Sequence, residues 1–328
     1  MANTKLETVL TQWQNLQPLA AIDRDRLSRR FTIDFNYNSN HIEGNTLTYG
    51  QTELLLLFGK IVGEANFRDC EEMKASNVGL QMVLVESSDK QLPLTQNFIR
   101  TLHRTLLRED YTVYRMLPGG VQTSYVIHAG QYKTRPNSVI TRYGDRFEYA
   151  SPEETPALMA DLVDWYNRAE QEGKLSPIDL AILFHYRYIR IHPFEDGNGR
   201  IARLMVNYIL SRHGYPMIVV RSRLKQDYLE ALHRADLIVG STPADGAHAS
   251  LKDIRPFHKY MVNLICHEIE NDVLFVTEKS QDVWWYDGER IAFRTPSYGK
   301  ILQELRREPK ATLAYLQEEI GINRSALQ

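Results

Sequence analysis

The sequence predicts a mainly helical fold that carries one β-hairpin and ends in a small helix-turn-helix module. Apolar residues recur at helical spacing along most of the 328 residues, often directly after a side chain that can cap a helix. Residues that favour strands gather in one stretch, at 132–149. The composition changes at about residue 282, where an outline of helix, short helix, glycine turn and helix start follows.

The composition excludes several classes of protein and site. A formal net charge of −2 gives no general attraction to nucleic acid or to an anionic membrane. The two cysteines, Cys70 and Cys266, cannot form a disulfide framework or a cysteine zinc site. The amino end lacks the apolar core of a signal peptide, and no apolar run approaches the roughly 18 residues that span a bilayer. We therefore expect a soluble, cytoplasmic protein.

Two short helices are expected first, at about 6–16 and 25–36, because apolar residues recur on one face of each. A polar segment follows, in which Gly44 is the expected helix stop. If the second helix continues to Glu43, Ser39 and Glu43 share one helical face.

Capping signals predict the helices that follow. Thr48 and Gln51 have capping-box spacing directly before an apolar run. Thr155 and Ser176 each place a capping hydroxyl before a first-turn proline. The helical patterns after the capping box cover about 68–85, 95–106, 156–170, 177–190, 198–213, 223–238 and 252–275.

The segment 192–203 combines residue types that few structural needs would bring together. Gly197 and Gly199 let the backbone approach a ligand closely, and the amides at the start of the following helix favour an anion. Arg200 and Arg203 lie three positions apart on that helix, so both guanidinium groups can close on one polyphosphate. The segment therefore predicts a phosphate cradle.

Three further residues of this segment supply the remaining chemistry. Asp196 is placed to hold Mg²⁺, an ion that prefers one or two carboxylates together with phosphate oxygens and water. Asn198 can donate an amide hydrogen bond to a phosphate oxygen. His192 can accept a hydroxyl proton, because its ordinary pKa of about 6.5 suits a base at neutral pH. Each residue alone can have an ordinary structural role, such as a cap or a turn. It is their occurrence together within one short segment that favours a functional site.

Other nucleotide and metal sites fit the sequence less well. No Gly-Lys pair is followed by Ser or Thr, so the chain has no P-loop. A Gly-x-Gly-x-x-Ala run at 197–202 imitates a dinucleotide fingerprint, but no βαβ alternation surrounds it. The residues at 233–236 do not form a kinase catalytic loop, because no Asp-Phe-Gly follows. A metal hydrolase would use His185, His192 and Asp196, yet the two histidines lie two helical turns apart.

At these residues the sequence resembles the Fic family, whose signature is His-x-Phe-x-(Asp/Glu)-Gly-Asn-Gly-Arg-x-x-Arg. The segment 192–203 matches it at every fixed position. The resemblance extends in layout over about 30–275 and implies a helical Fic core at 61–276 that transfers AMP from ATP to a protein Ser, Thr or Tyr hydroxyl and releases pyrophosphate. In that scheme His192 would deprotonate the target hydroxyl, and Asp196 would bind Mg²⁺ between the α- and β-phosphates.

The resemblance also implies roles for residues around this centre. Arg203 would hold the γ-phosphate. The hairpin at 132–149, with its turn at 144–145, lies where the family carries a flap that docks the target protein by strand addition. The anion hole would be lined by Gly197, Asn198, Gly199 and Arg200. The positions that resemble those enclosing the adenine are Tyr228, Leu229 and Asp236.

The segment 39–44 matches the family's inhibitory pattern, (Ser/Thr)-x-x-x-Glu-(Gly/Asn), and lies in an amino-terminal helical region at 1–60. The resemblance implies that Glu43 pairs with Arg203 and so removes the partner of the γ-phosphate. The physical basis is competition, because a carboxylate and a phosphate bind the same guanidinium. We therefore expect an auto-inhibited enzyme.

The region 282–328 is expected to form a partial winged-helix-like module, with helical patterns at 297–307 and 312–319 and the start of a third helix at 323–327. A helical appendage packed on the main domain is the other interpretation. The expected partners are a protein substrate on the flap and the protein itself, through self-modification or a homodimer. Alternatives within the fold are removal of AMP or transfer of UMP, phosphate or phosphocholine. The alternative that is not an enzyme is a nucleotide-sensing regulator whose carboxy-terminal module binds DNA.

Overall fold

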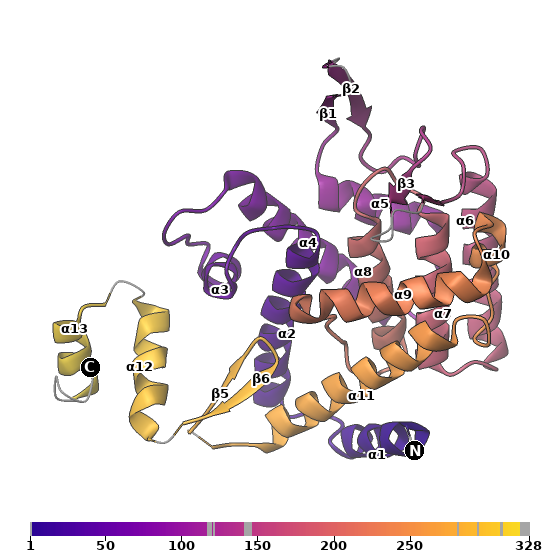
Figure 1. Cartoon of the computed structure of the whole chain (residues 1–328). Coiled ribbons are helices and arrows are strands. Elements are labelled where there is room, and N and C mark those ends of the chain that lie inside the picture. Colours follow the sequence, from indigo (N-terminus) through magenta and orange to yellow (C-terminus); the bar gives the residue numbers. More distant parts are fainter. Residues whose placement is uncertain are drawn as a thin grey trace.

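The computed structural model of the chain describes residues 2–116, 120, 122–140, 146–280, 282–293, 295–308 and 311–321. Helices dominate it, as the sequence predicts, and most of them surround one large buried core (Figure 1). The predicted capping box is present, because the Thr48 hydroxyl accepts from the Gln51 N–H and the Gln51 side chain accepts from the Thr48 N–H. The first helices are α1 (Ala2–Asn15), α2 (Ala21–Ile42), α3 (Tyr49–Phe58), α4 (Phe67–Ser88) and α5 (Gln96–Leu107).

Helix α2 continues well beyond the predicted end at residue 36, so that Ser39 lies on the helix and Glu43 directly follows it. Its last turns are built from asparagines rather than apolar residues. The side chains of Asn38 and Asn40 are buried, and each donates to a backbone carbonyl four residues earlier at 2.8 Å. These local bonds give each buried amide nitrogen a partner, and apolar spacing alone did not reveal the full helix because these positions are polar. At Gly44 a φ of 101° then turns the chain away.

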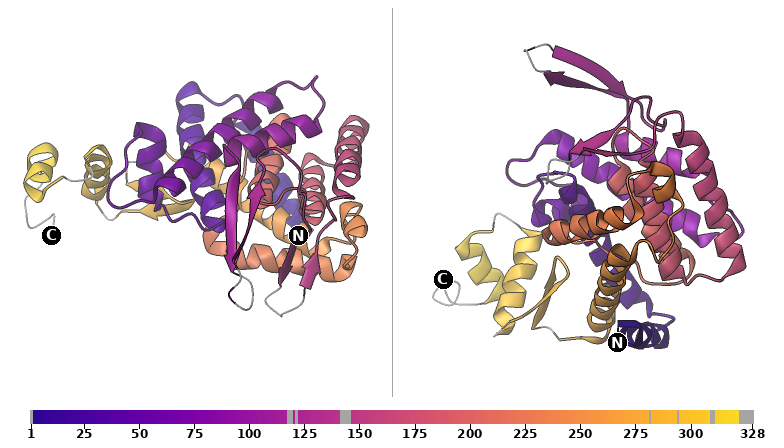
Figure 2. Two further views of the ribbon diagram at one scale, coloured as in Figure 1. Left: turned by 90° about the horizontal axis from the view of Figure 1, so that it is seen from above. Right: turned by 45° about the vertical axis from the view of Figure 1, so that its right-hand side comes forward.

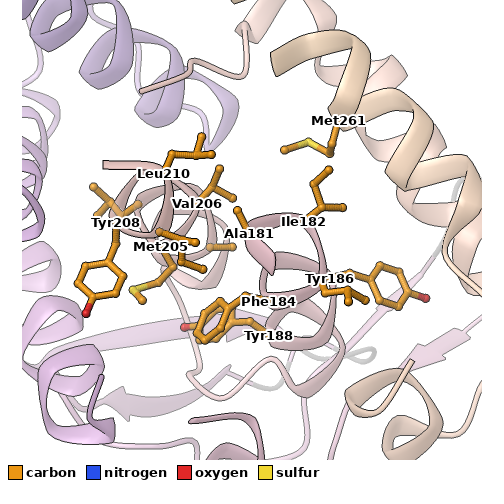
Figure 3. Packing of buried hydrophobic residues seen from close by; sticks show 14 of the residues in the cluster. Ala181, Ile182, Phe184, Tyr186, Tyr188, Met205, Val206, Tyr208, Leu210 and Met261 are labelled. Atoms are coloured by element: carbon orange, nitrogen blue, oxygen red, sulfur yellow. The ribbon is translucent and has the colours of Figure 1, made fainter. Parts of the chain in front are cut away.

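Helices α7 and α8 form the centre of the core. Figure 3 shows Ile182, Phe184 and Tyr188 of α7 beside Met205 and Tyr208 of α8, all of them buried. The helices in this half are α6 (Thr155–Glu172), α7 (Pro177–Ile191), α8 (Asn198–Arg212), α9 (Lys225–Val239), α10 (Pro243–Ala247) and α11 (Arg255–Thr277), with a 3₁₀ turn, η1, at Ser222–Leu224.

The predicted caps of α6 and α7 have different outcomes. Ser176 caps α7 as expected, because its hydroxyl accepts from the Asp179 N–H at 3.0 Å. Thr155 does not cap α6. It is the first helical residue, and its hydroxyl donates to the Ser151 carbonyl at 2.7 Å.

The prediction of a single β-hairpin is wrong, because the described residues contain three two-stranded antiparallel sheets. The expected hairpin is present at 132–149, although its turn at 144–145 lies outside the described residues. The longest hairpin lies upstream and projects from the helices (Figures 1 and 2). The six strands are β1 (Tyr111–Met116), β2 (Gln122–Ile127), β3 (Ser138–Ile140), β4 (Arg146–Glu148), β5 (Val283–Tyr286) and β6 (Glu289–Ala292).

The carboxy-terminal region begins with the β5–β6 hairpin. Its two-residue turn has φ 46° at Asp287 and φ 72° at Gly288, the combination that a type I′ turn requires. Two helices follow, α12 (Pro296–Arg307) and α13 (Leu313–Ile320), and Figure 1 shows them apart from the helical bundle. The expected third helix at 323–327 lies outside the described residues, so the winged-helix-like module stays a prediction. None of the described helices combines the length and the apolar character needed to cross a membrane.

Candidate active site

The segment 192–203 forms the turn between α7 and α8 and the first residues of α8. His192 follows the last residue of α7 and has a left-handed backbone conformation, with φ 51°. Two side chains between β2 and β3 donate to its carbonyl, Lys133 Nζ at 2.8 Å and Asn137 Nδ2 at 3.3 Å. Because a positive φ costs free energy for a residue with a Cβ, these bonds help to hold the histidine at the helix end.

The imidazole of His192 is held in its neutral form. Burial lowers the pKa of His192 to about 3, and the Lys133 cation acts in the same direction. The ring of Tyr149 stacks on it, with centroids 3.9 Å apart and an interplanar angle of 14°. A neutral imidazole has a free lone pair for a proton, as the predicted role of His192 requires, but a pKa this low makes it a weaker base than an exposed histidine.

Asn198 has a different contact from the one predicted. Its Oδ1 accepts from the Phe194 N–H at 3.0 Å, and its Nδ2 donates to the Phe194 carbonyl at 2.7 Å. The side chain is buried, and its amide closes the loop on itself. Asn198 therefore fixes the shape of the loop in this structure, and its predicted hydrogen bond to a phosphate stays a prediction.

His103 of α5 connects this loop to the rest of the core. Its Nδ1 accepts from the Gly130 N–H at 2.9 Å, so the proton lies on Nε2, which donates to the Asp196 carbonyl at 3.0 Å. The ring stacks on Phe194, with centroids 3.8 Å apart. Burial lowers the pKa of His103 to about 4, which keeps the ring neutral and preserves both bonds. No local motif marks His103 in the sequence, so its role was not predicted.

Asp196 is an ionised carboxylate at the edge of the loop. Tyr111 donates to its Oδ2 at 2.7 Å, the Gly197 N–H donates to its Oδ1 at 2.6 Å, and Arg200 lies 3.5 Å from Oδ2. Burial raises the pKa of Asp196, but Arg200 and these hydrogen bonds outweigh burial and leave the pKa below its ordinary value. Tyr111 begins strand β1, in the hairpin that the sequence analysis did not predict.

The same carboxylate is suited to Mg²⁺. A cavity of about 620 Å³ is lined by Asp196, Arg200 and Tyr111. Mg²⁺ takes one or two protein carboxylates and completes its shell with phosphate oxygens and water. A single ionised carboxylate beside the predicted phosphate cradle therefore fits the ion.

Glu43 and Arg203 meet, as the inhibitory pattern implies. Arg203 is 3% exposed, and its Nη2 lies 2.6 Å from Glu43 Oε1. Ser39 also accepts from Arg203, through its hydroxyl at 3.0 Å and its carbonyl at 2.8 Å. Burial raises the pKa of Glu43, but Arg203 outweighs this effect and keeps the pKa below its ordinary value.

The carboxylate of Glu43 lies directly over Gly199 near the start of α8. A Cβ at position 199 would overlap Glu43 Oε1. An anion therefore already occupies the space above the helix start, where the sequence predicts a phosphate. The two arginines hold different carboxylates in this state, since Arg203 binds Glu43 and Arg200 faces Asp196.

The three residues expected around the adenine have different surroundings. Tyr228 is buried and its hydroxyl lies 2.8 Å from His185 Nε2. Asp236 Oδ1 accepts from the Tyr186 hydroxyl at 2.8 Å and from Arg190 at 3.2 Å. Leu229 is exposed. The structure brings the three together only as residues of the same helix, α9, and their role stays a prediction.

Comparisons with known proteins identify relatives of this arrangement. The chain is 29% identical over 301 residues to protein adenylyltransferase fic-1 of Caenorhabditis elegans, covering 92% of this chain and 52% of that protein. It is also 29% identical over 244 residues to protein adenylyltransferase Fic of Nematostella vectensis, covering 74% of this chain and 49% of that protein. The chain therefore spans about half the length of these curated relatives.

Solved structures share the fold. A Fic domain containing signaling protein from Bacteroides thetaiotaomicron is 52% identical, with a TM-score of 0.78, covering 84% of this chain and 98% of that chain. Fic-1 from C. elegans is 25% identical, with a TM-score of 0.63, covering 83% of this chain and 72% of that chain. The family model described as Fic/DOC matches residues 93–210. From the sequence, the fold and these relatives it follows that the chain belongs to the Fic/DOC family.

Proposed function

We propose that the chain is an auto-inhibited protein adenylyltransferase, which transfers AMP from ATP to a hydroxyl group of a protein. The observation that carries the proposal is a neutral histidine beside an anion-binding helix start. His192 ends α7, and the space above Gly199 already holds the carboxylate bound to Arg203. The names of the curated relatives, which are protein adenylyltransferases, support the choice of AMP as the transferred group.

The reaction uses residues with complementary charges. His192 accepts the proton of the target hydroxyl while that oxygen forms a bond to the α-phosphorus of ATP, and pyrophosphate leaves as the bond to the β-phosphate oxygen breaks. Arg200 and the backbone amides at the start of α8 stabilise negative charge on the phosphates. Mg²⁺ on Asp196 would neutralise further phosphate charge. The target segment would dock on the flap at 132–149, beside His192.

Inhibition follows from one contact. The γ-phosphate needs the guanidinium of Arg203, which Glu43 holds at 2.6 Å in this structure. Ser39 keeps Arg203 in place, and Gly44 turns the chain away after the inhibitory residue. ATP would therefore bind without its γ-phosphate partner until Glu43 moves.

Two substitutions test the proposal. Glu43→Gly should raise the incorporation of label from ATP that carries the label on its α-phosphate, including self-labelling. Adding His192→Ala should abolish that incorporation, because no base remains at the helix end. Equal labelling by the Glu43→Gly protein and by the double variant would overturn the assignment.

The identity of the group is settled with the same protein. Competition by unlabelled nucleotides and mass spectrometry of the modified residue distinguish AMP from UMP, phosphate and phosphocholine. Incubating a modified protein with the unsubstituted chain tests whether the same site removes AMP.

A further inference from the structure

A row of stacked side chains connects the flap to His192. The guanidinium of Arg190, which is 1% exposed, lies 5.0 Å from the centroid of the Phe147 ring on β4. Phe147 meets Tyr149 edge-on, with centroids 5.3 Å apart and an interplanar angle of 72°. Tyr149 then lies flat on His192. Arg190 is itself fixed by two carbonyl oxygens after α9, at 2.8 and 3.0 Å.

We propose that Tyr149 positions the imidazole of His192 for proton transfer, an inference that rests on the proposed function. Lys133 and Asn137 hold the backbone carbonyl of His192 rather than its ring. Among the described residues no side chain forms a hydrogen bond with its Nδ1, so the stack replaces the carboxylate that often orients a basic histidine. A flat stack restricts ring tilt and covers one face of the ring, so the ring nitrogens lie at its edge and outside the stack.

Substitutions at Tyr149 in the Glu43→Gly protein test this role. Tyr149→Ala should lower kcat roughly tenfold to a hundredfold with little change in the KM for ATP, because the base loses its alignment. Tyr149→Phe keeps the ring and should retain kcat. Equal kcat values for the Ala and Phe variants would overturn the inference.

A measurement without turnover separates this inference from the proposed function. In nuclear magnetic resonance spectra the stacked ring shifts the His192 carbon-bound protons, so Tyr149→Ala should change these signals strongly and Tyr149→Phe weakly. Unchanged signals in the Ala variant would show that the stack is absent and overturn the inference. Absent labelling by the Glu43→Gly protein would instead overturn the proposed function.

A second, independent observation concerns the β5–β6 hairpin, whose turn docks on α2. Asp287 Oδ1 accepts from Asn38 Nδ2 at 2.6 Å and from Arg221 Nη1 at 3.3 Å. Asn38 Oδ1 accepts from the Ser222 N–H at 2.6 Å. The amide of Asn38 is thus held on both sides by groups outside its own helix.

Arg221 makes this docking site specific. It is 2% exposed and binds Asp34 of α2 at 2.9 Å and Glu268 of α11 at 2.6 Å. Gly288 lies on its guanidinium, where a Cβ would overlap the side chain. The hairpin turn therefore covers a buried cation and completes its shell of carboxylates.

We infer that the β5–β6 hairpin is a latch that holds the end of α2, and with it Glu43, in the inhibitory position. Asn38 directly precedes Ser39, which binds Arg203, and Glu43 lies little more than one turn further. Release of the hairpin removes the Asp287 carboxylate from Asn38 and Arg221 and leaves the last turns of α2 with fewer bonds.

Hydrogen exchange measures the latch directly. Asp287→Ala should accelerate amide exchange in the last turn of α2 roughly fivefold to thirtyfold, the factor expected for loss of one or two hydrogen bonds. The matched control is Arg290→Ala, which breaks the exposed pair between the same hairpin and Glu278 and leaves Asp287 in place. Exchange no faster than in the control would overturn the latch.

Labelling then tests the connection to activity. Asp287→Ala should raise self-labelling while Glu43 is present and should add nothing in the Glu43→Gly protein, since both changes remove the same restraint. If Glu43→Gly labels and Asp287→Ala does not, the hairpin does not control the site. If Glu43→Gly fails to label, the proposed function is wrong, and exchange alone decides the latch.

Discussion

Replacement of Glu43 by glutamine tests whether its carboxylate competes with a phosphate for Arg203. The substitution keeps the size of the side chain and removes its charge. In the native contact Oε1 accepts from Arg203 at 2.6 Å, and Arg203 is 3% exposed. The two bonds from Arg203 to Ser39 remain, so the guanidinium stays in place.

The size of the effect follows from the contact. A hydrogen bond to a charged group contributes about 1.5–3 kcal/mol and a neutral one about 0.5–1.5 kcal/mol. Glu43→Gln exchanges a charged hydrogen bond for a neutral one, so the loss is the difference between these two contributions. Because 39% of the Glu43 side chain is exposed, solvent screening keeps this difference small, at about 1 kcal/mol of unfolding free energy. The same contact must break before the γ-phosphate reaches Arg203, so Glu43→Gln should bind an ATP analogue about fivefold more tightly.

The pH dependence of this effect has a defined sign. The pKa of Glu43 in the folded chain is below its ordinary value, since Arg203 outweighs burial. A lowered pKa stabilises the fold fully above the unfolded pKa of about 4.3, and the stabilisation is lost as the pH falls through the folded pKa. The stability difference between the native chain and Glu43→Gln should therefore be full at neutral pH and shrink in acid.

Urea unfolding gives the stability difference, and calorimetry with a non-hydrolysable ATP analogue gives the affinity. Glu172→Gln is the control, because Glu172 forms an exposed pair with Lys174 and should change neither quantity measurably. A Glu43→Gln protein that loses stability without binding the analogue more tightly would refute the competition, and so would unchanged stability and affinity.

Three further substitutions have definite expectations. Gly199→Ala in the Glu43→Gly background places a methyl group where the phosphate must approach, so labelling should fall at least tenfold; unchanged labelling would contradict the assigned anion position. His103→Phe keeps the ring and removes two hydrogen bonds, so urea unfolding should show a loss of about 2 kcal/mol, and a smaller loss than for an exposed histidine would count against the bridge. Gly288→Ala should lower the melting temperature, because the methyl group overlaps Arg221 and φ is 72°.

Two of the three predicted helix caps form, and the exception is Thr155. Helix caps at Thr48 and Ser176 depend on residues within one turn, and both form as expected. The contact between Glu43 and Arg203 spans 160 positions, and only the resemblance to a family pattern pointed to it. The spacing of three residues between Arg200 and Arg203 predicted that both bind one polyphosphate. In this structure the two arginines hold different carboxylates.

The residues that sequence analysis missed act across long separations. Tyr111 reaches Asp196 over 85 positions and His103 reaches it over 93, and neither belongs to a motif. The hairpin that carries Tyr111 was missed although Tyr111, Val113 and Tyr125 are typical strand residues. The two strands of this hairpin pack mainly on each other, and their strand pattern is weaker than the helical patterns on either side in the sequence.

The bonds between Asn198 and Phe194 have a thermodynamic consequence. They close the loop on itself, and Asn137 adds a third bond to the Phe194 carbonyl at 3.0 Å. The loop therefore has its shape before any phosphate arrives, and exchange of a carboxylate for a phosphate orders no further backbone. The conformational entropy of the cradle was lost during folding, so it does not oppose nucleotide binding. The selectivity of the site then rests on which anion meets Arg203 with the better geometry.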